Sequence, residues 1–217
     1  MTSLILAAAL CWVAAAPAGS APPADTVPCQ VKERRERNFY ELDDGCLPAV
    51  SADGQYVAIA TDETGGGYGF ELLAVARKGR VARTFATFYP LDPAMPRVGP
   101  AVIRSFNQTL ARGGYRRLRK IETPREFEFD STAGNLGLRF RKGRLEVRRG
   151  DTVVGKSRRF ARYDDSELGL HVPIVEELFA PEDHAWLLMR VELVGRTGFY
   201  YPHGTEWTLV LLANAAK

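Results

Sequence analysis

The 217-residue sequence predicts a mainly β fold, built of antiparallel hairpins with one amphipathic helix. Two observations predict this fold class. Short segments of alternating apolar and polar residues are separated by glycine-containing turns, which is the pattern of hairpin strands with one buried face. Only one segment, at about residues 100–112, carries apolar residues at helical spacing.

The N-terminus, residues 1–18, is typical of a signal peptide. The run "LILAAALCWVAAA" (4–16) is apolar but too short to span a bilayer, and small residues and proline follow it. We expect cleavage after Ala18, although no Lys or Arg precedes the run. Leu10 is too large for the cleavage box of a lipid-anchored cysteine at Cys11. Since nothing later is apolar enough to span a bilayer, we expect a periplasmic or secreted protein without a lipid anchor or transmembrane segment.

Export bears on the two cysteines that remain, Cys29 and Cys46. Two cysteines in an oxidising compartment usually pair. A metal site or a reactive thiol would need further ligands or a nearby histidine, and the nearest in sequence is His171. We therefore predict a Cys29–Cys46 disulfide.

The domain organisation follows from composition. Residues 19–28 are rich in Pro and Ala and indicate a flexible tether. We expect residues 29–217 to form a single β-rich domain. A Pro-rich connector near residues 90–100 is the place where this domain would divide into two parts. The sequon at Asn107 falls inside the predicted helix, so we do not expect glycosylation there. The apolar stripe of that helix consists of Ile103, Phe106 and Leu110.

Hairpins are expected at the two copies of the sequence R-K-G-R, because both lie between strands of alternating residues. The first follows "FELLAVAR" (70–77) and turns at Lys78-Gly79. In the second, pairing Arg141 with Arg144 places Arg139 beside Glu146 on one face and apolar pairs on the other. The apolar pairs are Phe140 with Leu145 and Leu138 with Val147.

The stretch "GDTVVGKS", Gly150 to Ser157, matches the phosphate-binding loop pattern G-x-x-x-x-G-K-[ST]. Such a loop needs a buried strand before it and an amphipathic helix after it. The strand before it is charged, β-branched residues fill the loop, and no apolar stripe follows. A turn at Gly150-Asp151 inside a hairpin explains every residue, including the overlapping tripeptide "RGD". We therefore expect no nucleotide.

One segment carries a family resemblance: "PAVSADGQYVAIATDE", Pro48 to Glu63, resembles the repeat of TolB-type β-propellers. Such repeats open each blade with a proline, a Ser-x-Asp-Gly turn and an apolar strand. The residues that match the turn and the strand are Ser51, Asp53, Gly54, Tyr56, Val57 and Ile59.

A weaker copy, "FAPEDHAWLLMRVEL" at 179–193, keeps the proline and the acidic turn but has His184 in place of glycine. Propeller blades recur about every forty residues. These copies lie roughly 130 residues apart with a helix between them, so we do not expect a closed propeller. Either a loose internal duplication or the ordinary similarity of alternating strands explains the copies.

Catalytic patterns are scarce, and we expect no catalytic residue, metal site or cofactor. The three histidines show no zinc-binding spacing, and no G-x-S-x-G elbow occurs. Adjacent carboxylates are usually solvated turn formers, and an aromatic group near residue 200 is typical of strand cores, with sugar or peptide binding as the alternative. The residues considered are His171, His184 and His203; Asp43-Asp44, Asp62-Glu63 and Asp164-Asp165; Phe199, Tyr200, Tyr201 and Trp207.

Charge is distributed unevenly: residues 112–162 hold sixteen Lys and Arg against six Asp and Glu. Alternation places four arginines on the outward face of the predicted hairpin, where a polyanion or an acidic partner could bind. Glu146 can neutralise one of these arginines, and Glu126 and Glu128 two more if their strand is adjacent, so the remainder would form the positive surface. The alternative is an ordinary solvated face with ion pairs, or a basic patch that meets the chain's own acidic regions. The four arginines are Arg139, Arg141, Arg144 and Arg148.

These observations favour an exported, non-enzymatic β-rich module that binds a partner or has a structural role in the cell envelope or extracellular space. The alternative is an exported hydrolase whose site assembles only in three dimensions. The sequence names no ligand and no oligomeric state.

Overall fold

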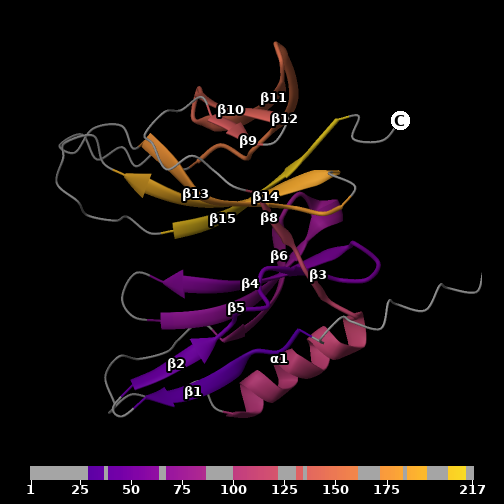
Figure 1. The fold of residues 1–217 in the computed structure, drawn as a ribbon, viewed down its shortest axis with the longest axis vertical. Coiled ribbons are helices and arrows are strands. Elements are labelled where there is room, and N and C mark those ends of the chain that lie inside the picture. The colour runs from indigo at the N-terminus through magenta and orange to yellow at the C-terminus, as the bar shows by residue number, and fades with distance from the viewer. Residues whose placement is uncertain are drawn as a thin grey trace, which may run out of the picture.

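The protein's structure is a computed structural model, which describes residues 29–36, 39–63, 67–86, 100–121, 131–133, 136–160, 172–182, 185–194 and 205–213. These residues form three antiparallel sheets stacked face to face, with helix α1 and a two-stranded ribbon at one end of the stack (Figure 1). The predicted mainly β class with one α-helix is confirmed. The described strands close neither a barrel nor a propeller.

The central sheet, of order β15-β14-β13-β8, is covered on both faces. Because neighbouring side chains on a strand point to opposite faces, β14 contributes to two layers. Trp186 and Leu188 pack towards one neighbouring sheet, and Leu187 and Met189 towards the other. This double burial explains why β14 is almost continuously apolar. The strands are β8 (Arg119–Ile121), β13 (Val172–Ala180), β14 (Trp186–Val194) and β15 (Thr205–Leu211).

The helix-side sheet, of order β6-β5-β4-β3-β7, lies between the central sheet and α1. Val57 and Ile59 pack against the central sheet, and Ala58 packs on the side of the helix. Its strands are β3 (Ala49–Val50), β4 (Tyr56–Glu63), β5 (Gly67–Ala74), β6 (Arg80–Ala86) and β7 (Arg116–Arg117).

Helix α1, Pro100–Gly113, confirms the predicted helix and its apolar stripe. Ile103, Phe106 and Leu110 are its buried residues. The ring of Phe106 stacks on Phe70 of β5 with 4.5 Å between the ring centroids. The helix is therefore held against the sheet by its apolar face, which is where most helical stability in proteins comes from.

A single extended segment joins two of the sheets. β7 pairs with β3 of the helix-side sheet, and β8 pairs with β13 of the central sheet. Leu118, which lies between β7 and β8, is buried in the cluster that both sheets share, and its N–H donates to the carbonyl of Pro48 at 2.9 Å. This segment fixes the helix-side and central sheets relative to each other.

The two sheets joined by this segment have equivalent strand orders, and both are antiparallel. Strands β3, β4 and β5 are consecutive neighbours in one sheet, as β13, β14 and β15 are in the other. In both, the first strand also pairs with the joining segment. The apolar strands of the two sequence copies, β4 and β14, hold the same place in these strand orders. The origin of the copies in a duplication stays a prediction.

The outer sheet, of order β12-β11-β10-β9, contains the second predicted hairpin in its predicted register. Lys142 (φ 51°) and Gly143 (φ 75°) both adopt positive φ, as a two-residue type I′ turn requires. Leucine and valine side chains of this hairpin pack on the central sheet. The strands are β9 (Ser131–Ala133), β10 (Leu136–Arg141), β11 (Arg144–Arg149) and β12 (Thr152–Lys156).

The first predicted hairpin has a longer connection between its strands than the two-residue turn expected from the sequence. Strand pairing ends at Ala74 and Arg80, and a 3-10 turn, η1 (Val75–Arg77), comes before Lys78. The expected strand to Arg77 was therefore too long. A Cβ on Gly79 would lie 2.8 Å from the Cβ of Leu209 on β15, so the wider turn packs tightly on the central sheet.

At the N-terminal end, β1 (Lys32–Glu36) and β2 (Phe39–Asp43) form a ribbon. The predicted Cys29–Cys46 disulfide is present, with 5.2 Å between the Cα atoms. The amide of Asn107 on α1 both accepts from the N–H and donates to the carbonyl of Val31, each at 2.9 Å. The sequon asparagine is thus engaged inside the fold.

Residues 1–28 and 87–99 lie outside the described residues, so the signal peptide, the tether and the sub-boundary near 90–100 stay predictions. Within the described part of the chain, no helix has both the length and the apolar character that crossing a membrane requires.

Candidate functional site

The four predicted arginines lie on one face of the outer sheet, on strands β10 and β11. The opposite face is buried: Leu138, Leu145 and Val147 belong to the core shared with the central sheet. Alternation along the strands therefore turns the arginines outward. We call this surface, Arg139, Arg141, Arg144 and Arg148, the arginine face.

Two of these arginines have partners and two have none among the described residues. Arg144 Nη1 donates to the carbonyl of Ser157 at 3.0 Å, and Arg148 Nη2 donates to the carbonyl of Asp151 at 2.7 Å. Both bonds are to main-chain oxygen, so both guanidinium groups keep their net charge. Arg139 and Arg141 are exposed and have no ion pair with any described residue.

Glu146 does not neutralise the arginine face as expected. It is opposite Arg139 in the strand pairing, but its ion pair is with Lys156 of β12, at 3.2 Å. Glu146 is only 6% exposed, and its second oxygen has no hydrogen-bond partner among the described residues. The prediction that it offsets an arginine was wrong, because the neighbouring strand supplies a lysine. Glu126 and Glu128 lie outside the described residues.

Further cations surround the face. Residues 136–160 hold nine Lys and Arg against two acidic residues, Glu146 and Asp151. Arg158 pairs with Glu206 of β15 at 3.0 Å. Lys142, Arg149 and Arg159 are exposed, and no described carboxylate pairs with them. The outer sheet is therefore strongly and locally positive.

The stretch "GDTVVGKS" forms a turn and strand β12, which confirms the predicted hairpin. Gly150 has φ +57°, a conformation that side chains with a Cβ disfavour. Gly155 has a different role: a Cβ there would lie 2.8 Å from Val210 and 2.9 Å from the carbonyl oxygen of Leu211. It allows β12 to approach β15 closely.

The last two motif residues also have structural partners. Lys156 pairs with Glu146, as described above. The hydroxyl of Ser157 accepts from the N–H of Leu145 at 2.9 Å and donates to the carbonyl of Arg158 at 2.6 Å. The motif is thus explained by folding, and no helix follows it to hold a phosphate among the residues described up to 160.

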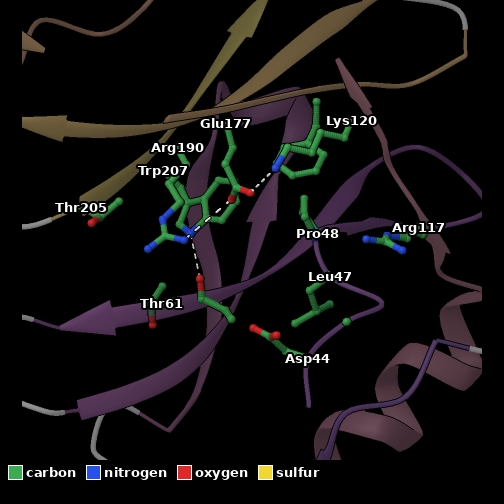
Figure 2. Close-up of a pocket in the computed structure, with 13 residues that line it drawn as sticks. Asp44, Leu47, Pro48, Thr61, Arg117, Lys120, Glu177, Arg190, Thr205 and Trp207 are labelled. Carbon is green, nitrogen blue, oxygen red and sulfur yellow. Dashed lines mark hydrogen bonds and ion pairs between the residues drawn. The ribbon is translucent and has the colours of Figure 1, made fainter. Parts of the chain in front are cut away.

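A second candidate site is a cavity of about 410 Å³ between the helix-side and central sheets, which we call the cleft (Figure 2). Its walls come from segments far apart in the sequence: the loop after β2, strand β4, the joining segment, and strands β13 to β15. Residues that line it include Asp44, Arg117, Lys120, Glu177, Arg190 and Trp207.

Ion pairs tie together most charges on the central-sheet side of the cleft. Glu177 pairs with Lys120 at 2.7 Å and with Arg190 at 3.7 Å, and Arg190 also pairs with Glu176 at 3.3 Å. Nearby, burial and the negative charge of Glu176 raise the pKa of Glu192. These groups form a compact network of alternating charge.

Asp44 lies across the cleft from this network (Figure 2) and is not part of it. Burial raises the pKa of its carboxyl group, with a smaller contribution from Asp43, while its own main-chain N–H and Arg190 act in the opposite direction. No described residue forms an ion pair with it. The expectation that the Asp43-Asp44 pair is a solvated turn holds for exposed Asp43, whose Oδ1 accepts from Gly45, but not for Asp44.

The indole of Trp207 forms part of the cleft wall. Its Nε1 donates to the carbonyl of Ala60 at 2.7 Å, and its ring lies 6.0 Å from that of Phe179. The β3–β4 pairing stops at Ala58, so this bond satisfies a carbonyl beyond the end of β3. Trp207 therefore links the two sheets while facing the cleft.

No sequence pattern predicts the cleft, because the residues that line it have no regular spacing along the chain. Trp207, predicted as a core residue, does pack against the cluster between the two sheets, but it also lines the cleft, as does Asp44 of the predicted turn pair. The other aromatic residues of that group, the three histidines and Asp164-Asp165 lie outside the described residues. The described residues contain no group of three or more His, Cys, Asp or Glu that could hold a metal ion.

Comparisons with protein-family models, with curated proteins and with solved structures found no match for this chain. The resemblance of Pro48 to Glu63 to a TolB-type repeat therefore stays a prediction. What the structure adds is the turn itself: Ser51 Oγ donates to Asp53 at 2.6 Å and accepts from the N–H of Tyr56 at 3.0 Å. These bonds are local and would form in any fold that used this turn.

Proposed function

We propose that this protein is an exported, non-enzymatic binding module of the cell envelope or extracellular space that recognises a polyanion or an acidic partner through the arginine face. The observation that carries the proposal is that Arg139 and Arg141 are exposed without an ion pair among the described residues, in a segment with nine cations and two carboxylates. The Cys29–Cys46 disulfide supports export, because structural disulfides persist in oxidising compartments.

The geometry of a sheet suits an extended polyanion. Alternate residues on one strand lie about 7 Å apart, and neighbouring strands lie about 4.8 Å apart. Arg139 and Arg141 are alternate residues of β10, and Arg144 pairs with Arg141 across the hairpin. Cations held at such spacings repel one another, and an anionic chain that runs over them relieves the repulsion and releases its own counterions.

Retention of the full chain on immobilised heparin, measured against salt concentration, tests the proposal. The variant Arg139→Gln with Arg141→Gln removes two cations that have no hydrogen bond or ion pair to a described residue, so the fold should be retained. Its control is Arg104→Gln with Arg112→Gln, which removes equal charge from exposed positions of α1 at the other end of the stack (Figure 1).

We expect the β10 variant to elute at clearly lower salt than the wild type, and the α1 variant to elute close to the wild type. Equal losses in both variants would mean that only net charge matters. Weak retention that is the same for the wild type and both variants would show that the arginine face is an ordinary solvated surface. Either result would overturn the proposal.

An exported hydrolase is the second candidate, and one observation favours it: Asp44 and Glu177 line the same cleft. Two carboxylates in unlike environments can serve as general acid and base. Turnover of chromogenic glycosides or esters, abolished by Asp44→Asn and retained by Asp43→Asn, would support this candidate. Absence of turnover across both substrate classes would remove it.

A further inference from the structure

The cleft has the size of a small-molecule site. Its volume of about 410 Å³ falls in the range of about 300–1,000 Å³ that such sites occupy. It lies between two sheets that the Trp207–Ala60 hydrogen bond and the joining segment fix relative to each other. A preformed cavity of this kind orders few groups when a ligand binds, so little affinity is lost to entropy.

The charges of the cleft argue against a strongly charged ligand. Lys120, Glu177 and Arg190 already neutralise one another, with Glu176 as a second partner for Arg190. The other two lining charges, Arg117 and Asp44, have no ion pair with a described residue, and they are opposite in sign. A ligand carboxylate or ammonium would have to compete with these ion pairs. A neutral polar ligand can instead accept from the cations and donate to the carboxylates without breaking the network.

Asp44 supplies the group that the network leaves unused. It faces Arg190 and Glu177 across the cleft, and no described side chain forms an ion pair with its carboxyl group (Figure 2). Threonine hydroxyls at Thr61 and Thr205 also line the cavity. A ligand with several hydroxyl groups could donate to Asp44 and accept from Arg190 at the same time, because each hydroxyl is both donor and acceptor.

Trp207 and Phe179 add an apolar wall beside these polar groups. The hydrogen bond from Nε1 to Ala60 fixes the plane of the indole, so the ring is a rigid contact surface. A sugar ring has both an apolar C–H surface and a rim of hydroxyl groups. We propose that the cleft between the helix-side and central sheets binds a neutral carbohydrate unit, which Asp44 and Arg190 hold by its hydroxyl groups and Trp207 contacts through its ring.

This site is separate from the arginine face and does not depend on it: the central sheet lies between them (Figure 1). Calorimetric titration of the full chain with cellobiose, maltose and diacetylchitobiose tests it, with the dipeptide Gly-Gly as a charged probe. We expect at least one disaccharide to bind and Gly-Gly not to bind.

Three variants locate the binding. Asp44→Asn replaces charged hydrogen bonds by weaker neutral ones and should weaken disaccharide binding roughly tenfold. Asp43→Asn makes the same change one residue away, outside the cleft lining, and should leave the affinity unchanged. Arg139→Gln with Arg141→Gln should also leave it unchanged, which separates this test from that of the polyanion proposal.

A fourth variant changes the opposite wall of the cleft, so that the test does not depend on the Asp44 loop alone. Trp207→Phe keeps an aromatic ring but removes the bond to Ala60, so it should weaken disaccharide binding in protein that circular dichroism shows to be folded. Binding of Gly-Gly in place of the sugars would overturn the proposal. The proposal would also be overturned if neither Asp44→Asn nor Trp207→Phe changed the disaccharide affinity, or if none of the three disaccharides bound.

Discussion

The arginine face and the cleft both contain basic side chains, but these form no ion pair with a described residue on the arginine face and are mostly held in ion pairs in the cleft. On the arginine face, Arg139 and Arg141 are exposed, and no described carboxylate pairs with them. In the cleft, Lys120 and Arg190 pair with glutamates at distances of 2.7 to 3.7 Å. One region has unbalanced charge, and the other has charge that is already balanced.

The difference teaches what each region can recognise. Unpaired exposed charges act over a distance comparable to the Debye length, about 8–10 Å at ordinary salt, and they attract any polyanion. Balanced charges around a cavity act only on groups in hydrogen-bond reach, so geometry decides what binds. The first region should be salt-sensitive and permissive, and the second salt-insensitive and selective.

The largest effect is expected from removing the Cys29–Cys46 disulfide, which holds the loop at one wall of the cleft. Cys46 lies in the loop that supplies Asp44, Gly45, Leu47 and Pro48 to the cleft wall. Replacing both cysteines by serine should lower the free energy of unfolding by about 3 kcal/mol, because the unfolded chain regains loop entropy. Urea denaturation measures the loss. In conditions where the variant is still folded, disaccharide binding should weaken and heparin retention should not; loss of heparin retention alone would contradict the division between the regions.

The next effect concerns the outer sheet, which supports the arginine face. Gly155→Ala should lower the free energy of unfolding by about 2 kcal/mol, since its Cβ would overlap atoms of β15 and of the chain just after it. Gly150→Ala should cost about 1 kcal/mol, because the turn is open but its φ is positive. Thermal and urea denaturation give both values. A larger loss at Gly150 than at Gly155, or magnesium-dependent ATP binding that Lys156→Ala abolishes, would refute this account of the hairpin.

The smallest effects concern two aspartates and have opposite signs. Hydrogen bonds from Ser51 and from the N–H of Gln55 lower the pKa of Asp53, so its stabilising contribution is present above the ordinary pKa and is lost as pH falls through the lowered value. Burial raises the pKa of Asp44, so the folded state favours its neutral form and loses stability as pH rises from the ordinary value through the raised one.

Urea denaturation between about pH 3 and pH 7 measures these contributions, since the ordinary pKa of Asp is near 3.9. Relative to the wild type, Asp53→Asn should become more destabilising as pH rises. Asp44→Asn should instead become less destabilising, or stabilising, over the same range. Parallel pH profiles for the two variants would show that Asp44 is not desolvated in the cleft wall.

The sequence predicted the features that depend on neighbours along the chain. Turn residues with positive φ and alternating strands set the register of the β10–β11 hairpin, and helical spacing set α1. The same alternation predicted that the four arginines lie on the face of the hairpin opposite Leu138, Leu145 and Val147, and they do so in the structure. It missed the burial of Glu146, because that depends on Lys156 of the next strand and on the surrounding fold.

The cleft could not be predicted in this way. Asp44 and Arg190 come together only because the joining segment holds two sheets face to face, and no spacing in the sequence encodes that contact. Trp207 looked like a core residue because strands of a core and walls of a cavity share the same apolar alternation. Sequence patterns report local structure, and this site is made by packing between sheets.

The most direct test of the central claim is the salt dependence of binding to a heparin oligosaccharide of fixed length. For a surface of unpaired cations, the logarithm of the binding constant falls linearly with the logarithm of salt concentration, by about 0.9 for each neutralised charge on duplex DNA. We predict a steep slope for the wild type, a slope shallower by about two for Arg139→Gln with Arg141→Gln, and an unchanged slope for Arg104→Gln with Arg112→Gln. One common slope for all three proteins would contradict the assignment of polyanion binding to the arginine face.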